Sequence, residues 1–312
     1  MKERVAAAGY AVAWSTVRRT PEWLPRNAFR MIADVLTRRG GRTAEQLAKN
    51  LSRVVGPGVD EATLAGLVHD GMRSYLRYWM EVFRLPAIAG EVFVRDMHMD
   101  GADRLQAAYR DQRGVVLALP HMGNWDAAGA WSVQLGMPFT TVAERLRPES
   151  LFDRFVAFRE SLGMEVLPLT GGASPYPTLR ARLEAGGLLC LLADRDLTVS
   201  GVPVQFFGEP ARMPAGPAAL SLDTDAVLLP VTLWYPEDGE PGWRGCIHEP
   251  VEPPTTGDRR ERIAAMTQSM ADVFGAGIAK HPADWHMVQR LWEADLKPHE
   301  SARLTTATGT TT

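Results

Sequence analysis

The chain of 312 residues has little of what marks a secreted, metal-binding or membrane-spanning protein. Its two cysteines, Cys190 and Cys246, provide neither a disulfide framework nor the paired spacing of a metal site. Cys190 lies in the apolar run LLCLLAD and is expected in the core, so a reducing compartment is the simpler expectation. No apolar run reaches the about 20 residues that cross a membrane, and VAAAGYAVAW leads into charged residues instead of a cleavage site.

Several motifs of catalysis and binding are also missing. The sequence has no G-x-S-x-G nucleophile elbow, no H-x-x-x-H pair and no Asp-rich loop, so we expect no covalent serine intermediate, no metal and no resident cofactor. It has neither helix-turn-helix spacing nor an RNA-binding aromatic motif, which argues against nucleic acid as a partner.

Charge is unevenly distributed along the chain. Residues 1–53 contain eleven Lys and Arg against four Asp and Glu, a net charge of +7, which leaves −10 on the remainder of a chain whose total is −3. Arginines in this segment alternate with apolar residues such as Trp23 and Met31, as in helices that lie on an anionic lipid leaflet. We expect a peripheral protein on the cytoplasmic face of the cell membrane. The alternative is an ordinary amphipathic helix packed on the body.

The pattern of elements predicts an α/β fold. Residues 1–90 consist of helical patterns and are expected to form a membrane-associating extension packed on the body. In residues 91–300, the runs GVVLALP, MEVLPLT, GLLCLLAD and AVLLPVTLWYP alternate with helical patterns, which predicts a central mostly parallel or mixed sheet covered by helices. Residues 301–312 have little to bury, so a flexible tail is expected.

One histidine and one aspartate follow the first of these strands, in PHMGNWDAAG (residues 120–129). On one continuous helix, His121 and Asp126 would be about 140° apart and could not meet. A turn at Met122 and Gly123 would let the histidine fold back, so that Asp126 orients it as a general base. The alternative is a structural histidine at a strand end beside an acid that favours the helix dipole.

The same stretch resembles the H-x4-D signature of glycerolipid-type acyltransferases and, more closely, the bacterial lipid A late acyltransferase family. ADRD (193–196), VPVQFFGEPARMPAGPAAL and HPADWHMVQRLW resemble later segments of that family in the same order, so the likeness covers roughly residues 70–293. Within the family, FTTVAERL, RFVAFRESLGMEVLPLTGG and LLADRDL are most similar to the actinobacterial phosphatidylinositol mannoside acyltransferases.

This resemblance implies transfer of a fatty acyl group from acyl-CoA, with palmitoyl-CoA as the expected co-substrate, to a mannose hydroxyl of a phosphatidylinositol mannoside. His121 would be the general base, Asp126 its orienter and Asp194 an assisting acid. Because acyl-CoA is already activated, a direct displacement without a covalent acyl-enzyme is expected.

Further polar residues fall in loops where an acceptor would lie, and we expect the acids to bind sugar hydroxyls and the arginines to bind phosphate. These candidate substrate-binding residues are Glu144, Arg145, Arg159, Arg195, Asp196 and Arg212. For the first three, a solvated surface ion pair is an equal alternative. His286 could approach the site or only pack near it.

Three other functions remain open at this point. The same His–Asp pair could activate water, which would make the chain an acyl-CoA thioesterase. The acceptor could be a different (lyso)phospholipid or glycolipid. A non-catalytic lipid-binding protein is the alternative outside the enzymes.

Overall fold

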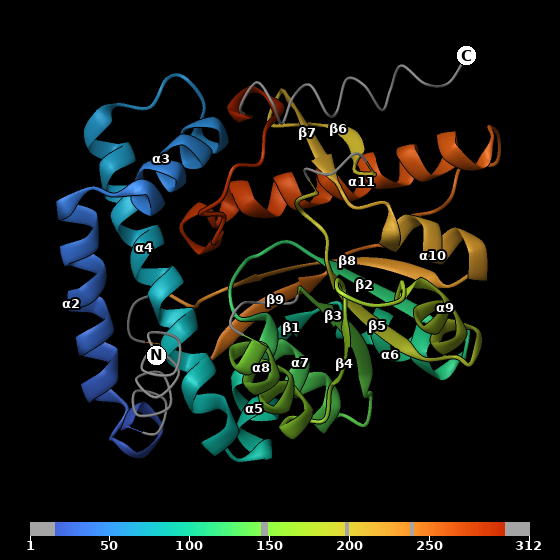
Figure 1. Cartoon of the computed structure of the whole chain (residues 1–312), viewed down its shortest axis with the longest axis horizontal. Helices are drawn as coiled ribbons and strands as arrows, with labels where there is room; N and C mark the ends of the chain where they lie inside the picture. The colour runs from blue at the N-terminus through green and yellow to red at the C-terminus, as the bar shows by residue number, and fades with distance from the viewer. Residues whose placement is uncertain (1–15, 145–148, 197–199, 238–239, 297–312) are drawn as a thin grey trace.

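The computed structural model describes residues 16–144, 149–196, 200–237 and 240–296. Within these residues, a seven-stranded sheet with the order β1-β9-β8-β2-β5-β3-β4 forms the centre (Figure 1). β8 and β9 pair antiparallel, and the other neighbouring strands of this sheet pair in parallel. The strands are β1 (Met97–Asp100), β2 (Val115–Leu119), β3 (Phe139–Ala143), β4 (Glu165–Pro168), β5 (Leu188–Leu192), β8 (Val227–Trp234) and β9 (Trp243–Ile247), and β6 (Val202–Phe206) forms a separate hairpin with β7 (Glu209–Met213).

The strand β2 shows why the predicted fold is correct. All five residues of VVLAL are buried, as expected for a parallel strand covered on both faces. Val116 and Ala118 belong to one hydrophobic cluster, whereas Val115, Leu117 and Leu119 belong to the other. The alternation of side chains along a strand therefore builds two cores, one on each face of the sheet.

Helices supply the other half of each core. α10 and α11 contribute to the first cluster, and α5 and α7 contribute to the second, on the opposite face (Figure 1). The helices of the described residues are α2 (Trp23–Arg39), α3 (Arg42–Val55), α4 (Glu61–Arg84), α5 (Gly90–Asp96), α6 (Ala102–Arg110), α7 (Trp125–Gln134), α8 (Glu149–Ser161), α9 (Tyr176–Glu184), α10 (Gly216–Thr224) and α11 (Arg259–Lys280), with the short 3-10 helices η1 (Leu85–Ala87), η2 (Pro282–Asp284) and η3 (Glu293–Asp295).

The N-terminal part is helical, as predicted, with α2 packed along α4 (Figure 1). Leu47, Leu51 and Met72, from α3 and α4, share the first hydrophobic cluster with the sheet. The boundary at residue 90 stays a prediction, and the expected tail at 301–312 lies outside the described residues. No helix in the described part of the chain is both long enough and apolar enough to cross a membrane.

Candidate active site

The carboxyl ends of β2 and β5 meet at one edge of the sheet. The two strands pair in parallel with Leu119 opposite Leu192, and the N–H of Ala193 donates to the carbonyl of Leu119 at 2.8 Å. Residues two positions beyond these partners, His121 and Asp194, therefore leave the sheet side by side. Strand ends of this kind are where open α/β sheets place their ligands.

His121 and Asp194 form a directly hydrogen-bonded pair. Nδ1 of His121 lies 2.6 Å from Oδ1 of Asp194, and the backbone N–H of His121 donates to Oδ2 at 2.9 Å. The indole N–H of Trp285 donates to the same Oδ2 at 3.0 Å. The carboxylate thus fixes both the ring and the backbone of the histidine, and Nε2 of the ring is left for a substrate proton.

Asp194 is completely buried, yet it remains ionised. Burial alone would raise its pKa, but the electrostatic interaction with His121 and the hydrogen bonds from His121 and Trp285 outweigh burial and lower the pKa. An ionised Asp194 accepts the Nδ1 proton, which selects the tautomer with an unprotonated Nε2. His121 is 38% exposed in its side chain, so this nitrogen is accessible to a substrate.

The predicted contact between His121 and Asp126 is wrong. Asp126 lies in the first turn of α7, where its Oδ1 accepts from Nε of Arg159 at 2.7 Å and its Oδ2 accepts from the hydroxyl of Tyr78 at 2.9 Å. The turn at Met122 and Gly123 does exist, with a positive φ of 59° at the glycine. The register of β5, however, delivers Asp194 to His121, and Asp126 pairs with α4 and α8 instead.

The Asp126–Arg159 pair is a buried ion pair. Asp126 is 2% exposed and the side chain of Arg159 is 16% exposed. Burial opposes the charge of Arg159, but Asp126 and Tyr78 outweigh it and raise the pKa of the guanidinium. Burial and the neighbouring Asp126 also raise the pKa of Tyr78, which stays a hydroxyl donor. The sequence analysis named both charged residues but did not predict that they bind each other.

An apolar pocket opens beside this ion pair. It lies between α7 and the sheet and is lined mainly by apolar side chains, as ligand sites usually are. Strand residues such as Leu117, Leu192 and Val231 line it, together with Asp126 and Arg159. Trp125 also lines it and stands edge-on to His121, with ring centres 5.6 Å apart. Through Trp125, the pocket is connected to His121.

Several of the other predicted residues gather near the same edge of the sheet. Glu144 is exposed at the end of β3, and Arg145 lies outside the described residues. Nε of Arg195 donates to the carbonyl of Arg290 at 2.8 Å. Burial lowers the pKa of Arg195, although the carboxylates of Asp194, Glu144 and Asp196 oppose that shift, so these acids lie close to it.

Arg212 has an internal role instead. Its side chain is 8% exposed, Nε donates to Glu293 at 2.6 Å, and Nη1 donates to the carbonyl of Gly201 at 2.9 Å. These bonds hold β7 to η3, which favours a structural role over the predicted phosphate contact. Among the described residues, no group of three or more His, Cys, Asp and Glu could hold a metal ion.

A buried polar layer behind His121 was not predicted. The N–H of His286 donates to the carbonyl of His121 at 2.7 Å, and Nε2 of His286 lies 2.9 Å from Oγ of Ser74. That hydroxyl also donates to Oδ1 of Asp284 at 2.5 Å, and the carbonyl of Asp284 accepts from the N–H of Gly123 at 2.9 Å. The layer therefore holds the backbone on both sides of Met122. The only signal in the sequence was the segment HPADWHMVQRLW.

The pKa values of His286 and Asp284 in this layer predict how the stability of the protein changes with pH. Burial lowers the pKa of His286 to about 3, so its stabilising contribution is present above the ordinary value of 6.5 and is lost as the pH falls toward 3. Burial raises the pKa of Asp284 to about 6, so its contribution is present below 3.8 and is lost as the pH rises through 6. Between pH 6 and 4 we expect His286→Gln to gain stability over the parent by about 1.4 kcal/mol per unit of falling pH.

Urea unfolding of parent and variant at a series of pH values measures this difference. Asp284→Asn is the matched control and should show the opposite slope. A constant difference between His286→Gln and the parent across the range would contradict the prediction.

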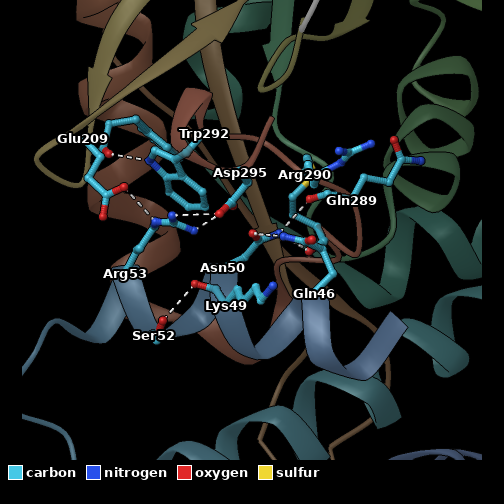
Figure 2. Close-up of polar contacts among 12 residues, drawn as sticks. Gln46, Lys49, Asn50, Ser52, Arg53, Glu209, Gln289, Arg290, Trp292 and Asp295 are labelled. Atoms are coloured by element: carbon cyan, nitrogen blue, oxygen red, sulfur yellow. Dashed lines mark hydrogen bonds and ion pairs between the residues drawn. The ribbon is translucent and has the colours of Figure 1, made fainter. Parts of the chain in front are cut away.

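The residues that follow Trp285 and His286 are held on α3, and Figure 2 shows Gln289, Trp292 and Asp295 beside Asn50 and Arg53 of this helix. Nδ2 of the buried Asn50 donates to the carbonyls of Met287 at 2.7 Å and Gln289 at 2.8 Å. Arg53 donates to both carboxylate oxygens of Asp295 at 2.8 and 3.0 Å, and its Cζ lies 4.6 Å from the ring centre of Trp292. A helix of the N-terminal part thus positions the residues that fix His121 and Asp194.

Asn50→Ala tests this anchoring. We expect a loss of roughly 2–4 kcal/mol in the free energy of unfolding, because the buried carbonyl of Met287 and the more exposed carbonyl of Gln289 both lose their donor. Any catalysis at His121 should also weaken, since the displaced segment carries the donors to Asp194 and His121. Lys49→Ala, on the exposed side of the same helix, is the control and should stay within about 0.5 kcal/mol of the parent. Equal stabilities of the two variants in chemical denaturation would refute the anchoring role.

The chain is similar to known proteins over most of its length. The model of the family described as bacterial lipid A biosynthesis acyltransferase matches residues 3–294. A phosphatidylinositol mannoside acyltransferase of Mycobacterium tuberculosis is 50% identical over 299 residues, which cover 95% of this chain and 91% of that protein. A protein of the same name from Mycolicibacterium smegmatis is 48% identical over 305 residues, which cover 97% of this chain and 96% of that protein.

Proposed function

Because the chain belongs to the bacterial lipid A biosynthesis acyltransferase family, we propose that it transfers a fatty acyl group from acyl-CoA to a mannose hydroxyl of a phosphatidylinositol mannoside. The family predicted from the sequence motifs is thereby confirmed. The names of the relatives support the acceptor. The observation that carries the proposal is the His121–Asp194 pair beside an apolar pocket.

In the proposed mechanism, Nε2 of His121 removes the proton of the mannose hydroxyl as its oxygen attacks the thioester carbonyl. The C–O bond forms, the tetrahedral intermediate collapses, and the C–S bond breaks. The imidazolium then returns its proton to the departing CoA thiolate. Asp194 stabilises the imidazolium and holds its orientation.

The apolar pocket is suited to the acyl chain. It supplies no reactive group that could form a covalent intermediate with that chain. Its lining is mostly apolar, and we infer that it takes the hydrocarbon tail of acyl-CoA. Cys190 is in the lining, but burial raises the pKa of its thiol, which therefore stays protonated and unreactive. This supports a direct displacement by the acceptor hydroxyl.

Asp126 and Arg159 take a revised role in this proposal. They lie at the polar end of the pocket and are fixed by each other, so they are suited to binding and aligning the acceptor. Glu144, Arg195 and Asp196 are at the sheet edge beside Asp194 and complete the proposed binding surface.

The direct test uses the purified protein with labelled palmitoyl-CoA and a panel of acceptors: phosphatidylinositol mannosides, other glycolipids and lysophospholipids. We expect labelled product with the mannosides and little CoA release when no acceptor is present. Rapid CoA release that added acceptor leaves unchanged would identify a thioesterase instead. Bound lipid without any turnover would identify a lipid-binding protein.

We further propose that α2 attaches the protein to the anionic cytoplasmic face of the membrane. α2 is an outer helix of the N-terminal part (Figure 1) and has unusually many exposed apolar side chains. They are Trp23, Leu24, Met31, Ile32, Val35 and Leu36. Arg38 and Arg39 lie in its last turn, where they can contact anionic lipids.

Replacing Trp23 and Met31 together by serine is expected to weaken binding to anionic vesicles by about tenfold or more, because both large side chains lose their place in the lipid. Flotation with vesicles measures the bound fraction. The matched control replaces Val94 and Leu169, which are 43% and 50% exposed elsewhere on the surface. If the two double variants bind alike, α2 is not the membrane-binding element.

A further inference from the structure

A second cavity lies between α2, α4 and the segments at residues 235–236 and 283–284. Its lining contains four arginines: Arg26 and Arg30 from α2, and Arg73 and Arg77 from α4. None of its lining residues lines the apolar pocket. We call it the arginine pocket.

The spacing of these arginines brings four positive charges together. On each helix the two residues are four positions apart, so they lie on the same face and repel each other. Facing each other across one cavity, the two pairs form a concentration of positive charge that has no benefit for folding by itself.

The two arginines of α4 are already fixed by acids. Arg73 makes two bonds to Asp34, of 2.7 and 2.9 Å, and the hydrogen bonds with Arg73 lower the pKa of that carboxyl to about 2. Nε of Arg77 donates to Glu81 at 2.7 Å, and its Cζ lies 3.8 Å from the ring centre of Tyr235. Their guanidinium planes are therefore held in place in the wall.

The two arginines of α2 differ in this respect. Within the described residues, neither Arg26 nor Arg30 has an ion pair or a side-chain hydrogen bond, although Arg26 is half-buried. The lining includes two acids, Asp70 and Asp284. Asp70 is 64% exposed, with its carboxylate 3.4 Å from His69. Asp284 uses both oxygens, for Ser74 and for the N–H of Tyr235 at 3.0 Å.

We propose that the arginine pocket is a binding site for a phosphate group. Guanidinium groups bind phosphate through paired N–H donors, and a tetrahedral phosphate presents oxygens to donors that approach from two helices at once. A bound phosphate would also offset the cost of leaving Arg26 half-buried without an anion. The phosphate can belong to the headgroup of an anionic phospholipid or to a soluble phosphate ester.

The site is separate from the one that binds the acyl chain, but it shares structure with His121. Ser74 and Asp284 line the arginine pocket, and the carbonyl of Asp284 accepts from Gly123 next to the catalytic loop. The proposal does not depend on the acyl transfer activity, because it rests on the charges and cavity alone.

Titration calorimetry with inorganic phosphate and glycerol phosphate, and cosedimentation with phosphatidylcholine vesicles with and without phosphatidylinositol, test the site. The variant R26A/R30A removes the two unpaired arginines. R38A/R39A is the matched control, because it removes the same charge from the same helix outside the pocket. R26K/R30K keeps the charge without the paired donors. Circular dichroism and thermal unfolding verify that each variant is folded.

We expect R26A/R30A to weaken binding of soluble phosphate by about tenfold or more, with R38A/R39A close to the parent and R26K/R30K between them. A lipid headgroup is the occupant if phosphatidylinositol vesicles also bind R26A/R30A less than R38A/R39A and glycerol phosphate competes. A soluble phosphate is the occupant if vesicle binding falls to the same extent in R26A/R30A and in R38A/R39A. Equal effects of the two pairs on soluble phosphate, or no binding of phosphate by the parent, would overturn the proposal.

Discussion

His121→Ala is expected to lower kcat/KM for acyl transfer by about a thousandfold or more, because the hydroxyl loses the base that removes its proton. The fold should survive. The histidine side chain is 38% exposed, and Asp194 would keep its bonds from the backbone N–H of residue 121 and from Trp285. The measurement is the initial rate with labelled palmitoyl-CoA and a phosphatidylinositol mannoside, together with circular dichroism.

The matched control for this variant is His98→Ala, which removes an exposed histidine on β1 and should leave the rate unchanged. Retained activity in His121→Ala, with the fold intact, would rule out His121 as the general base.

Asp194→Asn and Asp126→Asn are expected to impair different properties, the first the catalytic rate and the second mainly the stability. In Asp194→Asn, the amide can donate to Nδ1 of His121 and so select the tautomer in which Nε2 carries the proton. We expect a loss in kcat on the order of 10³- to 10⁴-fold, as for the equivalent change in serine protease triads. The buried site keeps its shape, so thermal stability should fall much less than activity.

Asp126→Asn should act mainly on stability. It leaves the guanidinium of Arg159 buried without its carboxylate, which costs about 3–5 kcal/mol in such pairs. Chemical denaturation and single-turnover rates on both variants separate the two effects. A full loss of kcat in a stable Asp126→Asn, with an active Asp194→Asn, would restore Asp126 as the residue that orients His121.

Some strands could be predicted from the sequence and others could not. The apolar runs that became β8, β2 and β5 are visible because these three neighbouring strands at the centre of the sheet are covered on both sides, and the run MEVLPLT at the edge strand β4 was also recognised. β1 at the opposite edge and its neighbour β9 were not predicted, because exposed or half-buried residues such as His98 and Arg244 interrupt their apolar pattern. A short strand with exposed or half-buried positions lacks the continuous hydrophobicity of the central strands.

The candidate site could be predicted in part. His121 could be named because it follows an apolar strand, and Asp194 because the segment ADRD resembles one in the family. The partner of His121 was mistaken because sequence spacing favours Asp126, five positions away, whereas Asp194 is 73 positions away. Only the register between β2 and β5 reveals the nearer acid. The donor from Trp285 to Asp194 crosses 91 positions and leaves no local signal.

The anchoring of residues 285–295 on α3 also determines when the enzyme can become active. The bonds from Asn50 to the carbonyls of Met287 and Gln289 span 237 and 239 positions, so they close among the longest loops in the chain. Such contacts form late in folding, because closing a long loop costs conformational entropy before the contact contributes any stability. During synthesis, His121 and Asp194 leave the ribosome well before Trp285 does. A nascent chain therefore has both members of the pair but lacks the donor and the anchor that complete the site, and catalysis begins only after residues 285–295 have been made.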